Sequence, residues 1–255
     1  MAKAAPKEPF RLPNADLGRE TQASKAYHAI RAMILRCKLP PGSLINDRLL
    51  MKQLGIGRTP IREALLRLSG ERLVLFQANH GIQVAPVGIS EIDDLYTVRL
   101  HSERLAWRLW LERATEEQVD RLTHRFDNVP GLIRRGDIEE LINLDFLFHS
   151  QVYQESGNPF LSQQLHSLSG VTYRLWFMTN RNDLKAQAQT ARSHAPIIEA
   201  VRRRDPQRLD AEISRHIIAA YETIMDRFKT KTVSRIGDLE IQLFTEETNH
   251  GKKQR

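Results

Sequence analysis

Four side chains of types that bind divalent metals occupy positions where the surrounding pattern calls for apolar residues. Asp145 and His149 fall within a stripe of helical spacing formed by Ile138, Leu141, Ile142, Phe148 and Val152. His194 and His216 interrupt two further apolar faces, those of Ala191, Ile198 and Val201 and of Leu209, Ile213, Ile217 and Ala220. Imidazole and carboxylate ligands suit Zn, Ni, Mn or Fe. We therefore predict a divalent metal site at these four residues. The alternative is that each histidine, taken singly, is a hydrogen-bonded core or surface residue.

A charged pair interrupts a fourth apolar stripe. Arg99 lies among Ile92, Leu95, Ala106 and Trp110, and Glu103 follows one helical turn later. The pair has two interpretations that the residues leave open. It is either a buried structural ion pair, or Arg99 faces the metal cavity and binds a carboxylate through two hydrogen bonds. Tyr173 and Arg174 are weaker candidates for contacts in that pocket, and the three tryptophans at 107, 110 and 176 suit a core or a dimer interface.

These polar groups must be positioned by helices, because no strand signal occurs after residue 87. Caps and prolines mark six helices of an all-helical antiparallel bundle. The expected spans run from Ser90 to about Leu111, from Thr115 to a break near Val129–Gly131, from Asp137 to about Ser156, from Asn158-Pro159 to about Thr179, from Asp183 onward, and from Asp205-Pro206 to about Lys229.

The stretch Asn46–Ser69 predicts a helix-turn-helix. Leu49, Leu50 and Leu54 mark the first helix and Ile61, Ala64, Leu65 and Leu68 the second. Asn46 can cap the first helix, Gly55 and Gly57 suit the turn, and Thr59-Pro60 is a start signal for the second. Arg58 and Arg62 then share the edge opposite the leucines. This is the layout of a recognition helix that enters a DNA major groove.

The segments that flank this helix pair complete a winged helix. A further helix follows Ser24, and two β-prone runs, Leu73–Gln77 and Ile82–Ala85, enclose a turn. His80 and Gly81 would form the wing tip. Glycine there allows the backbone to approach a minor groove, and the imidazole can contact phosphate or base edges.

The positive charge of the chain is concentrated in its first third. Residues 1–87 carry 14 Lys and Arg against 6 Asp and Glu, a net of +8, whereas residues 88–255 carry 24 against 25. This asymmetry indicates a polyanionic partner for the first module alone. We divide the chain into a mobile basic arm (1–22), a winged helix (23–87), a helical effector-binding and dimerisation domain (88–230) and a C-terminal extension (231–255). No apolar run suits a membrane span, no signal peptide is evident, and the single Cys37 fits a reducing cytoplasm.

The chain resembles the GntR family of bacterial transcription regulators. RTPIREALLRL followed by LVLFQANHGIQV is similar to the signature of its DNA-binding domain. YTVRLHSERLA, DFLFH, SHAPIIEAV and RHI resemble the helical ligand domain of the FadR-like branch, known as FCD. The resemblance covers roughly residues 24–229. It implies a cytoplasmic homodimeric repressor or activator that binds a palindromic operator in double-stranded DNA and responds to a small metabolite.

The resemblance also implies roles for particular residues. Arg48, Arg58, Arg62 and Gly81 match DNA contacts of the family, His80 matches the variable wing tip, and Thr59 matches a phosphate contact, with a helix cap as its competing role. Asp145, His149, His194 and His216 match the metal ligands of metal-binding members. Arg99 matches an arginine used toward acidic effectors, so a small carboxylate is the expected effector.

Two functions of other classes remain as alternatives. An Asp/His₃ site can activate water, which would suit a metal-dependent hydrolase with Glu103 as the inward acid to test. The chain could also be a DNA-binding protein whose helical domain only dimerises. We expect a regulator that is not an enzyme.

Overall fold

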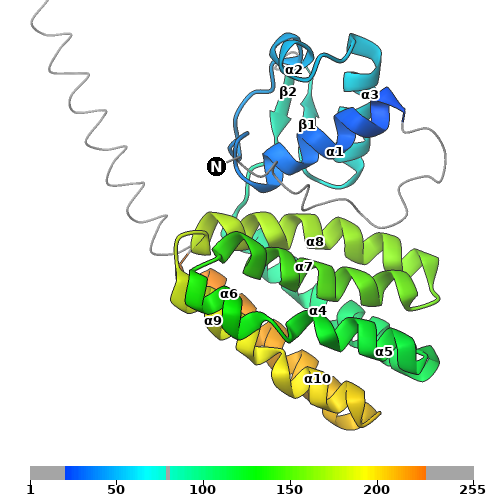
Figure 1. Ribbon diagram of the computed structural model, residues 1–255. Helices are drawn as coiled ribbons and strands as arrows, with labels where there is room; N and C mark the ends of the chain where they lie inside the picture. The colour runs from blue at the N-terminus through cyan, green and yellow to red at the C-terminus, as the bar shows by residue number, and fades with distance from the viewer. Residues whose placement is uncertain (1–20, 79–80, 228–255) are drawn as a thin grey trace, which may run out of the picture.

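The fold is described from a computed structural model that covers residues 21–78 and 81–227. Figure 1 shows an N-terminal domain of three helices and two strands lying above a larger helical domain. The predicted fold class, a winged helix-turn-helix followed by an all-helical bundle, is confirmed.

The N-terminal domain contains α1 (Gln22–Leu35), α2 (Asp47–Leu54), α3 (Arg58–Gly70), β1 (Val74–Gln77) and β2 (Gly81–Val84). The two strands are antiparallel, with Val74 opposite Val84 and Gln77 opposite Gly81. As expected, the Asn46 side chain caps α2 by accepting a hydrogen bond from the Leu49 amide. Gly55 ends α2 at φ +65°, a left-handed conformation that favours glycine.

Several local predictions in this domain were wrong. Helix α1 begins at Gln22, before Ser24, because the Thr21 hydroxyl caps it. Helix α3 begins at Arg58 with Gly57 as its N-cap and no side-chain cap bond, so Thr59 is not a helix cap. Gly57 has a φ of −67°, which any residue can adopt, so the turn does not require glycine at this position. Leu49 is 53% exposed and lies outside the apolar face, which Leu50 carries.

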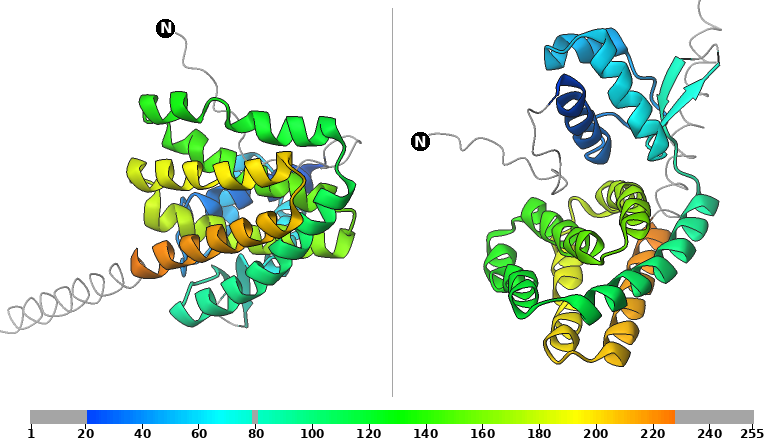
Figure 2. Two further views of the ribbon diagram at one scale, coloured as in Figure 1. Left: turned by 90° about the horizontal axis from the view of Figure 1, so that it is seen from below. Right: turned by 90° about the vertical axis from the view of Figure 1, so that its right-hand side faces the viewer.

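Within the described residues, the helical domain contains the seven helices α4 to α10 and one further helix without a label, over residues 206–227. The seven are α4 (Ile89–Arg113), α5 (Glu116–Thr123), α6 (Val129–Arg135), α7 (Ile138–Glu155), α8 (Pro159–Asn180), α9 (Leu184–Ser193) and α10 (Ala195–Arg202). Helix α4 and the 206–227 helix lie side by side, joined by a hydrogen bond of 2.6 Å from the Tyr221 hydroxyl to Asp93 (Figure 2).

Two helix breaks differ from the expected spans. The helix capped by Thr115 ends at Thr123 and is followed by a short 3₁₀ turn (His124–Phe126), so Val129–Gly131 opens α6 instead of breaking a helix. The helix expected from Asp183 onward is interrupted at His194, between α9 and α10. Pro196 follows this break and cannot continue a ladder of backbone hydrogen bonds, since it lacks an N–H.

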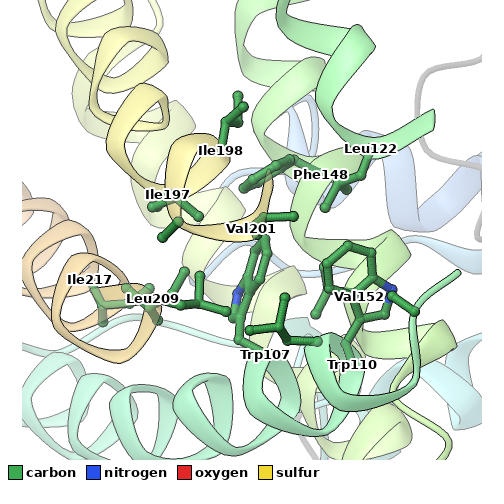
Figure 3. Close-up of a cluster of buried hydrophobic side chains, with 14 of the residues drawn as sticks. Trp107, Trp110, Leu122, Phe148, Val152, Ile197, Ile198, Val201, Leu209 and Ile217 are labelled. Carbon is green, nitrogen blue, oxygen red and sulfur yellow. The ribbon is translucent and has the colours of Figure 1, made fainter. Parts of the chain in front are cut away.

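The main core of the helical domain lies between α4, α5, α7, α10 and the 206–227 helix (Figure 3). Trp107, Trp110 and Phe148 are fully buried in it, which confirms the core assignment of the two tryptophans. This rigid packing fixes the faces of the helices that carry the candidate site residues.

Helix α8 is the element on which the two domains meet. Its Tyr173, together with Ile142 and Phe146 of α7, packs into the same apolar cluster as the core of the winged helix. Gly170 allows α1 to approach, because a Cβ atom there would lie 3.1 Å from Nη2 of Arg31. The domain junction is therefore a packed apolar contact as well as a covalent linker.

Candidate metal centre and DNA-binding face

The structure brings together the four residues that the sequence singled out as metal ligands. Asp145 and His149 come from α7, His194 from the break between α9 and α10, and His216 from the 206–227 helix. One ligand atom from each lies within 4.8 Å of the other three. Ligand atoms that share a metal with bonds of about 2.1 Å lie about 3.0 Å apart when adjacent and about 4.2 Å when opposite. The cluster therefore comes close to the dimensions of a coordination sphere.

The outward nitrogen of each histidine has a partner that fixes the tautomer of the ring. Nδ1 of His194 lies 2.9 Å from the carbonyl oxygen of Thr190, and Nδ1 of His149 lies 2.9 Å from a carboxylate oxygen of Glu103. Both partners only accept hydrogen bonds, so both Nδ1 atoms carry the proton.

His216 is fixed in the same way through a hydroxyl. Its Nδ1 lies 2.9 Å from Oγ of Ser193, and that hydroxyl donates its own hydrogen to the Thr190 carbonyl. Ser193 can therefore only accept from His216, so Nδ1 of His216 also carries the proton. Each of the three neutral rings then has an unprotonated Nε2.

The three Nε2 lone pairs converge on the Asp145 carboxylate. Nε2 of His149 lies 3.3 Å from Nε2 of His216, and Nε2 of His194 lies 3.2 Å from Oδ1 of Asp145. Both atoms of the latter pair are buried and have no hydrogen-bond partner among the described residues. Four acceptors that face one another repel unless a cation or extra protons lie between them. The donor set thus fits a divalent metal ion.

The electrostatics of the cluster are consistent with a neutral imidazole and an ionised carboxylate. Burial holds the pKa of His216 well below its usual value, which favours the neutral ring. Burial raises the pKa of Asp145, but His194 and His149 outweigh it and lower that pKa below the ordinary range. These are the protonation states that metal ligands require.

Glu103 links the metal cluster to Arg99. Its side chain is 0% exposed, and its two oxygens contact Nε of Arg99 at 3.0 Å and Nδ1 of His149 at 2.9 Å. The same oxygens accept from Tyr153 and Trp107. Burial raises the pKa of Glu103, whereas the neighbouring His149 and Arg99 lower it to a net value below the ordinary range. Arg99 is therefore in a buried ion pair, one of its two predicted interpretations.

Arg99 also lines a cavity beside the cluster, as its second interpretation requires. The cavity has a volume of about 40 Å³, and Asp145, His149 and His216 form part of its wall. Tyr173 and Trp176 line it from α8, which confirms Tyr173 as a pocket residue. Arg174 does not line it, so that prediction was wrong: its guanidinium donates to the carbonyl of Ala85 at the domain junction.

Sequence reasoning missed most residues that support the cluster. Thr190 and Ser193 orient two of the histidines, and Tyr153 and Tyr96 line the cavity. Tyr153 follows His149 by four residues, so helical spacing could have placed it on the same face. Thr190 acts through its backbone carbonyl, and no residue type signals such a role.

The hydrolase alternative is not favoured by this arrangement. A general base needs a lone pair directed at a water or a substrate. Both oxygens of Glu103 instead accept from four buried donors, so its carboxylate is engaged within the protein.

The predicted DNA-binding residues lie at the exposed start of α3 and beside it. Arg58 and Arg62 are 65% and 58% exposed, and their Nε atoms lie 3.8 and 4.0 Å from one oxygen of Asp47. Arg48 and Thr59 are exposed as well. Gly81 is exposed at the start of β2 with a φ of +87°, and His80 lies outside the described residues. The two arginines are thus exposed at a helix start, and Asp47 holds both at the outer limit of ion-pair distance.

Comparisons with known proteins agree with this architecture. Residues 22–84 match the family described as "Bacterial regulatory proteins, gntR family", and residues 94–219 match the FCD domain. The chain belongs to the GntR family of regulators and carries an FCD domain. This GntR-family chain is 26% identical over 191 residues to the uncharacterized HTH-type transcriptional regulator YdhC of Bacillus subtilis, covering 74% of this chain and 85% of that one.

Other relatives are transcriptional regulators too. McbR of Escherichia coli is 30% identical over 130 residues, which are 51% of this chain and 59% of that one. The repressor NanR of Cronobacter sakazakii is 26% identical over 231 residues, 81% and 86% of the two chains. The chain is therefore a DNA-binding transcriptional regulator.

Solved structures share the fold. E. coli McbR/YncC superposes with a TM-score of 0.73 at 20% identity, covering 82% of this chain and 99% of that one. A GntR regulator from Rhodococcus sp. RHA1 superposes with a TM-score of 0.65 at 16% identity, covering 80% and 98%. Within residues 21–78 and 81–227, none of the helices combines the length and apolar composition that a membrane crossing requires.

Proposed function

We propose that this GntR-family regulator senses a small carboxylate through a divalent metal ion held by Asp145, His149, His194 and His216. The observation that carries the proposal is the convergence of three unprotonated Nε2 atoms on a carboxylate, with Nδ1 bonds that fix this orientation. The bound metal would supply a Lewis-acidic centre for a carboxylate oxygen. Imidazole and carboxylate ligands leave Zn, Ni, Mn and Fe as candidates.

Arg99 is the proposed second anchor for the effector. Its guanidinium lines the same cavity as the metal cluster, with Nε committed to Glu103 and Nη1 3.4 Å from the Tyr96 hydroxyl. A guanidinium held in a fixed orientation suits bidentate recognition of a carboxylate. The apolar side chains Ile142, Phe146 and Trp176 complete the cavity and limit it to a small organic acid.

We further propose that the protein acts as a homodimer on a palindromic operator. Arg58 and Arg62 of each copy would enter successive major grooves about one helical turn of DNA apart. Arg48, Thr59, His80 and Gly81 would add contacts to phosphates and to the minor groove. Effector binding would then alter the placement of the two DNA-binding domains through α8, which lines the cavity and packs against the winged helix.

Zinc titration tests the metal site. Chelator-treated protein should bind one Zn²⁺ per chain in calorimetry, and elemental analysis of untreated protein should find a comparable amount of metal. His194→Ala should weaken binding at least tenfold, since removal of one ligand leaves three. His101→Ala, which changes an exposed histidine on α4, is the matched control. Equal affinity in all three proteins would contradict the assignment.

A thermal-shift series with citrate, succinate and malonate tests the effector site. At least one acid should raise the melting temperature of the metal-loaded protein, because a ligand that binds only the folded state stabilises it. Arg99→Met should abolish that shift, whereas the exposed Arg108→Met on the same helix should retain it. If His194→Ala binds operator as the wild type does, and no acid changes operator binding by either protein, the helical domain serves dimerisation only.

A further inference from the structure

A second cavity, separate from the histidine cluster, lies between the two domains. It has a volume of about 800 Å³, within the range of small-molecule sites. Glu71, Arg72 and Leu75 of the winged helix form one wall, residues 85–87 form its end, and α4 and α8 form the other wall. Neither the metal cluster nor the DNA-binding face uses this interdomain cleft.

Arg174 lies in the wall of the interdomain cleft as a buried charge that forms no ion pair with any described residue. Its side chain is 1% exposed, and Nη1 donates to the backbone carbonyl of Ala85 at 2.9 Å. Nε is buried and has no hydrogen-bond partner among residues 21–78 and 81–227. Burial lowers the pKa of Arg174 to about 10, partly offset by Cys37 and Glu91. A buried guanidinium that has one neutral partner retains the capacity to bind an anion.

The acidic residues that line the interdomain cleft form no ion pair with Arg174. Glu71 is committed to the winged helix, where it accepts from Nε of Arg31 at 3.0 Å and from the Tyr27 hydroxyl. Glu91 accepts from the Gly88 amide at 2.9 Å and so caps the start of α4. Asp94 is exposed to solvent, which screens its charge. Arg174 therefore keeps a buried charge that none of these carboxylates pairs with.

Much of the remaining wall of the interdomain cleft is apolar, alongside the polar side chains of Arg72, Gln163, Gln164 and Ser167. A stripe of α8 runs from Leu175 through Val171 and Leu168 to Phe160, and Leu95 and Val98 face it from α4. Arg174 lies fourteen positions after Phe160 on α8, a distance of about 21 Å along the axis at about 1.5 Å per residue. Val98 and Phe160 are 41% and 84% exposed, so an apolar chain lying here would cover surface that now contacts water.

We propose that the interdomain cleft is a second ligand site, for an amphipathic monoanion whose carboxylate pairs with Arg174 and whose apolar chain lies along α8 toward Phe160. Such a ligand would contact both domains at once, through Leu75 on β1 and through α4 and α8. It would thereby act on operator binding independently of the metal cluster.

Octanoate is a suitable probe, with octanol as its uncharged counterpart. Calorimetry on the full chain should detect octanoate binding, at least tenfold weaker binding of octanol, and at least tenfold weaker octanoate binding by Arg174→Met. Arg174→Lys should restore part of the affinity, because it retains the charge but not the planar fork. His194→Ala and Arg99→Met should bind octanoate as the wild type does, which separates this site from the effector cavity.

A second variant keeps the test decisive if Arg174→Met disturbs the domain junction. Ser167→Trp places a large side chain in the wall of the interdomain cleft and leaves Arg174 in place, so it should also weaken octanoate binding at least tenfold. Unchanged affinity in both variants would overturn the proposal, and so would the absence of octanoate binding by the wild type. Loss of binding in Arg99→Met alone would assign octanoate to the effector cavity instead.

Discussion

Replacing Glu103 with glutamine is expected to destabilise the protein strongly, because Glu103 compensates a buried positive charge. Its carboxylate accepts from Arg99, Tyr153, Trp107 and His149 at 3.0, 2.5, 3.2 and 2.9 Å. In glutamine one of the two oxygens becomes an NH₂ group, which donates. One pair of donors then loses its acceptor in either orientation of the amide, and Arg99 loses its counter-charge in both.

The magnitude follows from the burial of the pair. Removing one partner of a buried ion pair costs about 3–5 kcal/mol in free energy of unfolding. In a chain of this size each kcal/mol lowers the melting temperature by about 2–4 °C. Glu103→Gln should therefore lower the melting temperature by about 6–20 °C. Differential scanning calorimetry in excess chelator measures this without a contribution from bound metal.

Two further variants test the reasoning. Arg99→Met combined with Glu103→Gln removes both charges, so it should recover at least half of the lost melting temperature, since no unpaired ion remains. Glu112→Gln alters an exposed glutamate of the same helix and should change the melting temperature by less than about 2 °C. A small effect of Glu103→Gln, or a double variant less stable than the single one, would refute charge compensation as the source of the stability.

Three more predictions concern stability and DNA binding. Burial and the charge of Arg31 lower the pKa of His166 to about 4, so the unfolding free energy should fall as pH drops from about 6.5 toward 4, because only the unfolded chain takes up that proton. The loss should be about 2 kcal/mol after allowance for partial exposure, and urea unfolding of His166→Gln should show a correspondingly flatter pH dependence. The double variant Arg58→Ala/Arg62→Ala should bind operator at least a hundredfold more weakly in a band shift, with a shallower salt dependence and an unchanged melting temperature. The exposed control Arg135→Ala should bind operator as the wild type does. Specific binding by the double variant at wild-type strength would exclude α3 as the recognition helix. Zinc at about a thousandfold excess over its dissociation constant should raise the free energy of unfolding by about 4 kcal/mol, and chelator should reverse the effect. A response of His216→Ala equal to that of the wild type would contradict the metal assignment.

The proximity of the four metal-ligand candidates could be predicted because helical periodicity fixes which face a residue occupies. Asp145 and His149 share the apolar stripe of α7, and the structure places them together with His194 and His216. Periodicity also paired Arg99 with Glu103 one turn later. The contact of Glu103 with His149 could not be predicted, since it depends on how α4 packs against α7.

The wrong predictions have identifiable physical causes. Successive residues of a helix point about 100° apart, and Arg174 is turned away from the cavity that Tyr173 lines, toward the Ala85 carbonyl. The break at His194 was overlooked although Pro196 signals it. Leu49 fits an apolar pattern on a short helix, yet α2 buries only Leu50 fully. A pattern of two turns is too short to fix a face.

Helix α8 carries Tyr173 and Trp176 in the cavity beside the histidine cluster and Arg174 in the interdomain cleft, with Gly170 against α1. Helix α8, about 10 Å across, therefore lines both cavities and also packs against the winged-helix domain. Two chemically different ligands, one in each cavity, would both contact α8. Operator binding would then respond to their combination without any relay of intermediate side chains.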